Sequence, residues 1–173
     1  QSAQGERNYY GVAVVNGTVF VTNNGDDTKC WISKFEVKDG KATELTPFIA
    51  TKVLTEVDAP VPIAVSSEGE LVVGQMGEVN TEGDSLLTTY NPKDGKLIKK
   101  WTTGLSDIAG LAYSPKTKKW YCTDFAWAKP ENGGLFELTI ADDKVTAKKL
   151  AKLDKPTALT FDKDGNLYVA IFG

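Results

Sequence analysis

The chain has 173 residues, a formal charge of −3 and no histidine. This length is enough for one domain with a sizeable core. The acidic balance disfavours nucleic acid as a partner, because phosphate binding requires a concentrated basic patch. The missing histidine excludes Ser-His-Asp and Cys-His catalysis within this chain. The sequence also has no apolar run long enough to span a bilayer.

The first expected unit covers residues 10–50 and contains four short strands. "GVAVVNGTVFVTNNG" alternates apolar and small or polar residues on both sides of Asn16-Gly17, which predicts a hairpin. Asn16-Gly17-Thr18 also fits a glycosylation acceptor, but the turn is the favoured interpretation. "ISKFEVKDGKATEL" then predicts a second hairpin around Asp39-Gly40, because Asp-Gly suits the positive φ values of tight turns.

The same pattern recurs in residues 61–103 and 109–150, and its first half recurs in 156–173. The corresponding apolar positions carry the numbers 12, 63, 111 and 159, which are separated by 51, 48 and 48 residues. Four strands in about 48 residues are typical of one β-propeller blade. We therefore predict an all-β fold, a β-propeller with three complete four-stranded antiparallel blades and the inner half of a fourth. A β-sandwich with accidental periodicity is the weaker alternative.

Two segments resemble repeats of known propeller families. "VFVTNNG" at 19–25 is similar to the YVTN-type repeat, and "PTALTFDKDGNLYVA" at 156–170 resembles the NHL and gluconolactonase/regucalcin-like repeats. The resemblance implies propeller architecture, but propellers host many unrelated activities. The E-G-P-x-W start of the gluconolactonase-like enzymes is missing, because "YYGVAV" stands there. No catalytic residue is therefore carried over.

Strand alternation predicts which side chains are buried between blades. The expected core residues are Val12, Val14, Ile63, Val65, Leu111, Tyr113, Leu159 and Phe161. The half blade would leave residues 167–172 as an open sheet edge, which is an association hazard. We expect this edge to pair with the remainder of a longer propeller or with another chain. A second reading has two copies forming a ring of seven blade-equivalents, although the complete first blade does not supply the missing outer strands.

One end of the predicted propeller gathers acidic loops. These loops carry Asp26, Asp27, Glu78, Glu82, Asp84, Asp124 and Glu131. Asp58, Asp107 and Asp154 precede the inner strands and should surround the mouth of the central channel. They could hold a hard cation such as Ca²⁺, which takes six to eight oxygen ligands, or they could form a solvated acidic rim. The loop "DFAWAKPENGG" adds Asp124, Phe125 and Trp127 as candidate residues for binding a ligand or partner, unless its aromatic rings pack beneath the loop.

Three functions remain open from these observations. The favoured one is a non-enzymatic binding or scaffold propeller that presents its acidic face to a protein or small-molecule ligand. The alternative is a divalent-metal-dependent, lactonase-like hydrolase with its site at the channel mouth, and the third is a subunit of a larger assembly. The polar N-terminal residues fit an extracellular or periplasmic location. Cys30 and Cys122 form no C-x-x-C motif, and we expect both to be free and structural.

Overall fold

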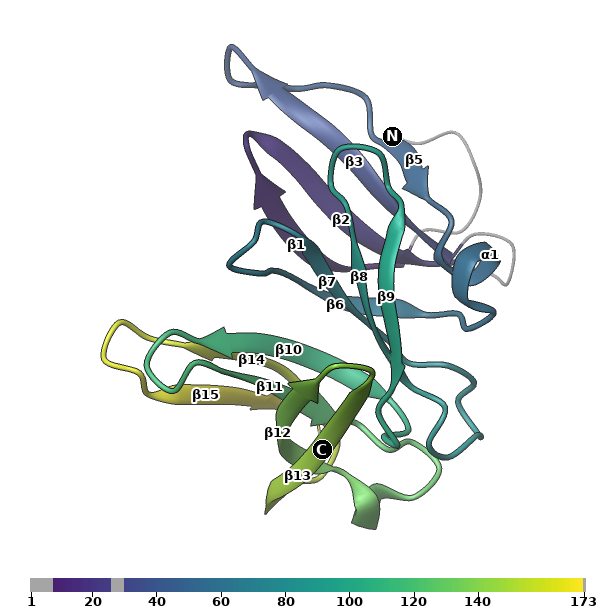
Figure 1. Ribbon diagram of the computed structural model, residues 1–173, viewed down its shortest axis with the longest axis vertical. Helices are drawn as coiled ribbons and strands as arrows, with labels where there is room; N and C mark the ends of the chain where they lie inside the picture. The colour runs from purple at the N-terminus through teal and green to yellow at the C-terminus, as the bar shows by residue number, and fades with distance from the viewer. Residues whose placement is uncertain (1–7, 26–29, 173) are drawn as a thin grey trace.

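A computed structural model describes residues 8–25 and 30–172. The helices in these ranges are α1 (Thr51–Thr55) and a short 3-10 helix, η1 (Pro130–Asn132). The remaining regular structure is β-strand, arranged in antiparallel sheets whose strands follow one another in the sequence (Figure 1). The prediction of an all-β chain with almost no helix is confirmed.

We number the sheets as blades 1 to 4. Blade 1 contains β1 (Tyr9–Val15), β2 (Thr18–Asn24), β3 (Cys30–Lys38), β4 (Lys41–Ala42) and β5 (Thr46–Ile49). Blade 2 contains β6 (Pro60–Val65), β7 (Leu71–Gln75), β8 (Leu86–Tyr90) and β9 (Leu97–Thr102). Blade 3 contains β10 (Ile108–Ser114), β11 (Lys119–Asp124), β12 (Gly134–Ala141) and β13 (Lys144–Lys152). Blade 4 contains β14 (Pro156–Phe161) and β15 (Leu167–Ile171).

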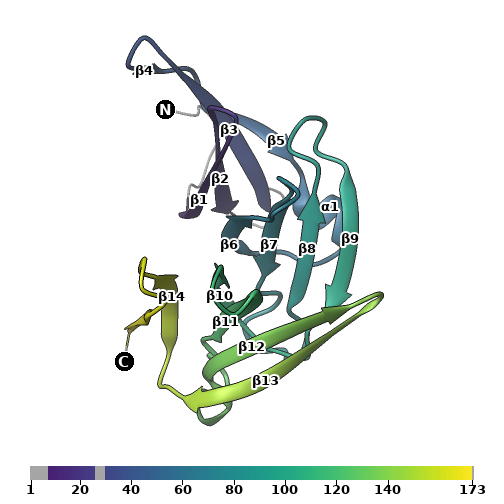
Figure 2. The same ribbon diagram turned by 60° about the vertical axis from the view of Figure 1, so that its left-hand side comes forward.

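The first strands of the four blades lie next to one another in chain order. β1 contacts β6, β6 contacts β10, and β10 contacts β14. Figure 2 shows these inner strands along the concave side of a curved row of sheets, with β9 and β13 on the outside. The register of each inner hairpin shifts near the start of its first strand, so even this irregularity repeats from blade to blade. This arrangement is that of a partial β-propeller, as the sequence predicts.

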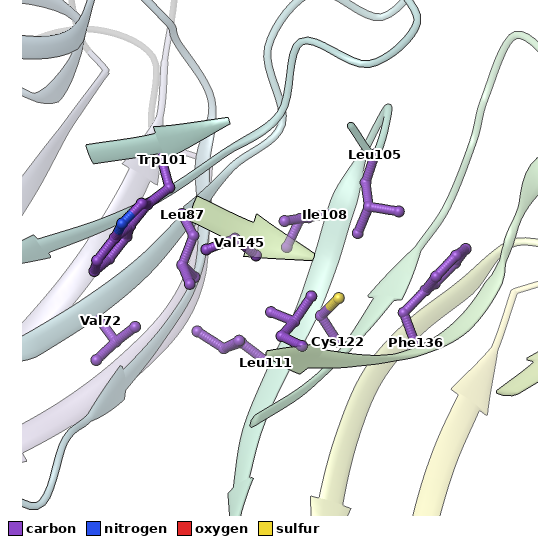
Figure 3. Close-up of a cluster of buried hydrophobic side chains, with 10 residues drawn as sticks. Val72, Leu87, Trp101, Leu105, Ile108, Leu111, Cys122, Phe136 and Val145 are labelled. Atoms are coloured by element: carbon purple, nitrogen blue, oxygen red, sulfur yellow. The ribbon is translucent and has the colours of Figure 1, made fainter. Parts of the chain in front are cut away.

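The hydrophobic core lies between blades. In one cluster, the side of blade 1 that faces blade 2 packs against that blade. Phe20 and Ile32 of blade 1 lie there with Ile63 and Leu71 of blade 2. A second cluster joins blade 2 to blade 3 (Figure 3). Its buried members are Val72, Leu87, Trp101, Leu105, Ile108, Leu111, Cys122, Phe136, Leu138 and Val145. Blade 2 is therefore covered on both faces, which explains why every residue of β7 and β8 is buried.

Inner strands of neighbouring blades approach closely because small residues lie between them. A Cβ on Gly110 would lie 2.4 Å from the Thr157 carbonyl oxygen and 2.6 Å from Leu159 Cδ2. The same close approach recurs between blades 1 and 2, where a Cβ on Gly11 would lie 2.9 Å from Ile63 Cγ2. These distances are too short for any real side chain. The glycines thus set the spacing between blades.

Threonine hydroxyls join the same strands. Thr22 Oγ1 donates a hydrogen bond to the Val61 carbonyl oxygen at 2.7 Å, and Thr123 Oγ1 donates to the Thr157 carbonyl oxygen in the corresponding place. Each bond runs from the second strand of one blade to the first strand of the next. Because the bonds are largely shielded from water, they add directional order to the apolar contact between blades.

The core prediction is correct for the middle blades and wrong at the start of the chain. Ile63 and Leu111 are buried, and the other expected residues of blades 2 to 4 are half-buried. Val12 and Val14 are instead 64% and 59% exposed. They point to the side of blade 1 opposite blade 2, and no sheet among the described residues covers that side. The strand alternation is as predicted, but burial of these two side chains would also require a sheet on that side of blade 1, and residues 8–25 and 30–172 provide none there.

The hairpin turns agree with their sequences. Asn16 and Gly17 both have positive φ, 49° and 83°, as a two-residue turn between twisted strands requires. Asp39 and Gly40 repeat the arrangement with φ values of 52° and 73°. These turns fix the pairing of β1 with β2 and of β3 with β4.

Candidate functional site

The inner strands enclose a hollow of about 240 Å³ on the concave side of the row. The residues that line it are Tyr10, Gly11, Val61, Pro62, Ile63, Ala109, Gly110, Leu111, Thr157, Ala158 and Leu159. Within the described part of the chain, this lining contains no carboxylate and no amide side chain. The channel side of the structure is therefore mostly apolar, and its polar groups are largely backbone groups and two hydroxyls.

A larger hollow of about 560 Å³ lies elsewhere, between the turns of blades 1 and 2. It opens beside Thr43 and Glu44, where β4 has ended and β5 has not begun. Lys34 and Glu36 bring both signs of charge to its wall, while Phe20 and Phe35 provide apolar surface. Neither hollow includes the acidic residues that the sequence predicts as a site.

Those acidic residues lie at the opposite end of the blades, which we call the mouth. The mouth comprises the connections between blades and the loops that follow β7 and β11. Asp124, at the end of β11, is buried and accepts hydrogen bonds from three backbone amides: Ser106 at 3.1 Å, Asp107 at 2.7 Å and Ala126 at 3.1 Å. The carboxylate of Asp124 therefore holds the connection between blades 2 and 3 to the following loop.

Asp107 fixes the next part of that loop. Its Oδ2 accepts a hydrogen bond from the Trp127 amide at 2.6 Å, while its buried Oδ1 has no hydrogen-bond partner among the described residues. Burial raises the pKa of Asp107 to about 6, with the Trp127 amide opposing this shift and the charges of Asp124 and Asp84 adding to it. Asp107 is thus a carboxyl group that the fold keeps in an unfavourable environment.

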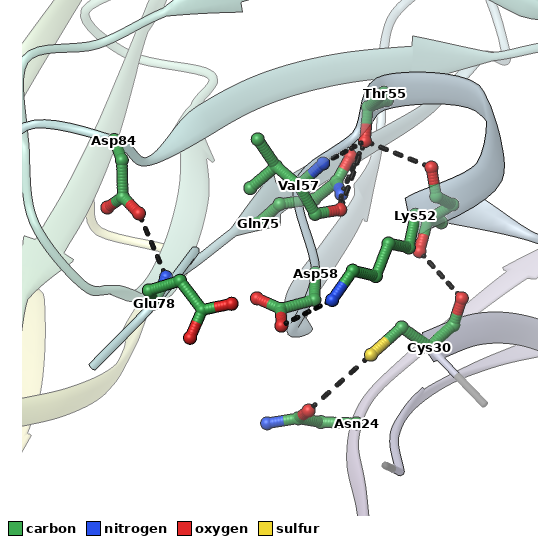
Figure 4. A network of polar contacts seen from close by, with 10 residues as sticks. Asn24, Cys30, Lys52, Thr55, Val57, Asp58, Gln75, Glu78 and Asp84 are labelled. Carbon is green, nitrogen blue, oxygen red and sulfur yellow. Dashed lines mark hydrogen bonds and ion pairs between the residues drawn. The ribbon is translucent and has the colours of Figure 1, made fainter. Parts of the chain in front are cut away.

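Asp58 and Asp84 lie nearby at the mouth (Figure 4). Asp58 forms a 3.3 Å ion pair with Lys52 from α1, and Asp84 accepts the Glu78 amide at 2.9 Å. Burial raises the pKa of Asp84, and the charge of Asp58 adds to the shift. One oxygen of each carboxylate is buried without a hydrogen-bond partner in the described structure.

The structure does not assemble the predicted metal ligands. Asp58 and Asp107 are buried, but Asp154 is exposed on the connection between blades 3 and 4. Among residues 8–25 and 30–172, no three acidic or cysteine side chains are grouped so that they could hold a metal ion. Asp26 and Asp27 lie outside the described residues. Calcium binding stays a prediction.

The predicted aromatic loop forms a platform. The rings of Phe125 and Trp127 are stacked, with centroids 5.7 Å apart and planes 10° from parallel. Phe172 packs against Phe125 at 6.0 Å, and Lys155 Nζ lies 5.5 Å from the Trp127 ring. Trp127 remains 53% exposed, so the ring is held in place while its surface stays open to solvent. We call Phe125, Trp127 and Phe172 the aromatic platform.

Sequence reasoning singled out Phe125 and Trp127 but missed their partners. Phe172 and Lys155 come from blade 4 and its connection, about thirty to forty-five residues later. The sequence indicates Asp84 only as one of the acidic loop residues. The structure adds that Gly77, with φ of 80°, packs against it, because a Cβ on Gly77 would overlap the Asp84 carboxylate. A glycine can thus be required because a carboxylate packs against it, but the sequence alone does not show which carboxylate this is.

Known structures with the same arrangement are propellers. The chain superposes on a luciferin-regenerating enzyme with a TM-score of 0.68 at 17% identity, over 98% of this chain and 57% of that one. The chain has the β-propeller fold. A gluconolactonase from Xanthomonas campestris gives 0.64 at 15% identity over 94% and 56%, and the WD40 repeats of RRP9 give 0.59 at 16% over 90% and 42%.

These likenesses concern the fold alone, because the identities are low and the neighbours include both enzymes and WD40 repeats. The chain spans 57% or less of the length of each of these propellers. No protein-family profile and no curated protein sequence matches it. Neither α1 nor η1, the helices of the described residues, has the length and apolarity that crossing a membrane requires.

Replacing Asp107 tests how much the burial of its carboxyl group destabilises the fold. The pKa of Asp107 is about 6 in the folded protein against an ordinary value of 3.8. The folded state therefore binds more protons between these values, and the Asp107 contribution to stability falls as pH rises through this range. We expect Asp107→Asn to raise the free energy of unfolding by about 1–3 kcal/mol above pH 6, and by progressively less towards pH 4.

Urea unfolding of both proteins from pH 4 to pH 8 measures this difference. Subtracting wild type from variant removes the pH dependence of the other carboxyl groups. Asp154→Asn is the matched control, because Asp154 is exposed on the corresponding connection of the next blade, and it should change nothing. A variant that is less stable than wild type at pH 8 would mean that the Asp107 charge contributes favourably to the fold.

Proposed function

We propose that this chain is a ligand- or protein-binding propeller segment whose binding surface is the mouth around the aromatic platform. One observation carries the proposal: Trp127 presents an exposed ring that is already fixed from three sides. Its amide is bonded to Asp107, its ring is stacked on Phe125, and Lys155 lies over it. A ring that is both exposed and held in place favours a binding role.

A fixed aromatic surface suits binding for a physical reason. Ordering a flexible side chain on association costs about 0.5–1.5 kcal/mol, and this cost is already met within the fold. Large aromatic residues are also the common anchors of protein interfaces. The flat area offered by the aromatic platform fits a ring, such as an aromatic side chain of a partner protein or the apolar face of a sugar. The rim adds Glu131 and the ion pair of Lys129 with Glu82 at 2.5 Å.

A metal-dependent, lactonase-like hydrolase is the second candidate. The buried, unpartnered oxygens of Asp58, Asp84 and Asp107 favour it, since such groups gain from a cation. The apolar lining of the channel hollow weighs against it, because hydrolysis assisted by a divalent ion needs oxygen ligands beside the substrate. Calorimetric titration with Ca²⁺ and a lactone-hydrolysis assay separate the two candidates.

The binding proposal is tested by removing the exposed ring. A library of small aromatic and monosaccharide compounds is screened by saturation-transfer NMR, and Kd values of the hits are measured for wild type and for Trp127→Ala. We expect hits whose affinity falls at least about tenfold in the variant, which corresponds to 1.4 kcal/mol. Ile98→Ala, which truncates an exposed side chain on the outer strand of blade 2, is the control and should keep the wild-type affinity.

Two results would contradict the proposal. One is a set of hits that bind Trp127→Ala as tightly as wild type, because the binding surface would then lie elsewhere. The other is strong Ca²⁺ heat together with Ca²⁺-dependent lactone hydrolysis, which would establish the hydrolase instead.

A further inference from the structure

The hollow of about 560 Å³ between the turns of blades 1 and 2 has the size of a small-molecule site, for which about 300–1,000 Å³ is usual. One wall comes from blade 1 and the other from the turn between β8 and β9 of blade 2. We call it the turn hollow. The residues of its walls that matter below are Val15, Phe20, Lys34, Glu44, Pro92 and Lys93.

The two walls are fixed relative to each other. Gly95, in the turn between β8 and β9, has φ of 74°, and a Cβ there would lie 3.1 Å from Ile49 Cγ1 of β5. Figure 2 shows this turn beside β5. The turn is also held internally, because Asn91 accepts hydrogen bonds from the Gly95 amide at its carbonyl oxygen and from the Lys93 amide at Oδ1, both at 2.9 Å. The turn hollow is therefore preformed, as small-molecule sites usually are.

The lining combines apolar surface with two positive charges. Val15 and Phe20 of blade 1 and Pro92 of blade 2 supply the apolar part. Lys34 belongs to β3, and Lys93 belongs to the facing turn. Within residues 8–25 and 30–172, neither ammonium group forms an ion pair with a carboxylate. Apolar surface beside unpaired positive charge suits an anion with an apolar body.

The ammonium group of Lys34 is held in place within the half-buried part of the wall. Lys34 Nζ lies 3.7 Å from the centroid of the Phe48 ring, and this ring packs on Phe20 with centroids 5.9 Å apart. An ammonium group has three N–H donors, and those of Lys34 meet no hydrogen-bond acceptor in the described part of the chain. A ligand carboxylate could accept them at a reduced entropic cost, since the side chain is already positioned.

The carboxylates of the lining do not cancel the two positive charges. Glu36 forms a 2.8 Å ion pair with Lys38, and the hydrogen bond from Lys38 lowers the pKa of Glu36. Glu44 is exposed and is the one lining carboxylate left without an ion pair among the described residues. The adjoining hollow of about 470 Å³ has Glu68 and Glu70 in its wall beside a single lysine, so it suits an anion less well.

We propose that the turn hollow binds a small organic carboxylate with an apolar body. The carboxylate would lie against Lys34 and Lys93, and the apolar body against Val15, Phe20 and Pro92. Because Lys38 neutralises Glu36, the lining offers two positive charges and one negative charge, which matches a singly charged anion better than a phosphate. This site lies at the other end of the blades from the mouth, and the proposal does not depend on the binding function of the aromatic platform.

Titration with hexanoate at constant ionic strength, followed by amide NMR, tests the site. Saturable shift changes are expected at lining residues such as Thr18, Lys34 and Thr46. Hexanamide has the same shape without the charge and should bind at least about threefold more weakly. Affinity should rise from acetate to butyrate to hexanoate, by up to about fourfold for each methylene group that becomes buried. Hexanoate offers no ring to the aromatic platform, so Trp127→Ala should bind it as wild type does.

Charge variants then show which residues hold the carboxylate. Lys34→Met and Lys93→Met each remove one charge and keep an apolar stem, and each should lower the affinity for hexanoate by about three- to fivefold. Lys93 is exposed, so its variant should fold even if the substitution at Lys34 disturbs the wall. Glu44→Gln should strengthen binding, because it removes the opposing charge. Lys41→Met is the matched control: Lys41 is exposed in β4 of the same blade, outside the lining, and its variant should keep the wild-type affinity.

Three results would overturn the proposal. Hexanoate without saturable shifts, or bound no better than hexanamide, would mean that the turn hollow does not recognise a carboxylate. Binding that both lysine variants retain in full would place the carboxylate on another surface. Binding that is lost in Trp127→Ala but kept in Lys93→Met would place hexanoate at the aromatic platform.

Discussion

Leu111→Asp should abolish cooperative folding of the chain. Leu111 is buried in the cluster between blades 2 and 3, where its neighbours are apolar side chains from both sheets. An unpaired charge in such a place costs several kcal/mol, in addition to the lost packing of the leucine. A domain has only about 5–15 kcal/mol of stability in total, so one such substitution removes most or all of it. Thermal unfolding followed by circular dichroism should show no cooperative transition.

Two companion variants show that the effect belongs to the site. Leu111→Met keeps the apolar volume and should cost less than about 1.5 kcal/mol. Val53→Asp places the same charge on an exposed position of α1 and should unfold as wild type does. A soluble Leu111→Asp protein with a cooperative transition would show that blades 2 and 3 do not pack through this residue.

The repeat is what made the fold predictable from the sequence. Alternating strands and Asn-Gly or Asp-Gly turns recur at a constant spacing, and each needs only local information to be recognised. Val12 and Val14 show where such information ends. Alternation determines which side chains share a face of a strand. Burial also requires a neighbouring sheet, and the sequence of blade 1 does not predict whether such a sheet covers that face.

The mouth was predictable in part, for a related reason. The period places Asp58, Asp107 and Asp154 at similar backbone positions, but it does not set the direction of their side chains. Asp107 is buried because its carboxylate accepts a hydrogen bond from the Trp127 amide and its own amide donates one to the Asp124 carboxylate. Asp154 is exposed to solvent. Hydrogen bonds between loops determine the directions of these side chains, and the spacing of the repeat does not predict those hydrogen bonds.

Gly110→Val should release blade 4 from blade 3. Any Cβ at residue 110 would lie 2.4 Å from the Thr157 carbonyl oxygen and 2.8 Å from Thr123 Oγ1, the two atoms whose hydrogen bond joins the blades. Both the carbonyl and the strand that carries it would have to move, and the two added methyl groups enlarge the clash. Overpacking of this kind typically costs about 1–3 kcal/mol, and a forced movement of backbone raises the cost. For a chain of this size, each kcal/mol lowers Tm by about 2–4 °C.

The stability lost in Gly110→Val should be concentrated in blade 4. This blade contains only the hairpin β14–β15 and packs on blade 3 alone among the described sheets. Hydrogen exchange should therefore accelerate across residues 157–171 in Gly110→Val while β6 to β9 keep their protection. Ala158→Val is the matched control, since Ala158 holds the same position in blade 4 and its side chain is exposed. It should leave the fold and the exchange pattern intact. Equal exchange in wild type and Gly110→Val would mean that the close approach at Gly110 does not hold blade 4 in place.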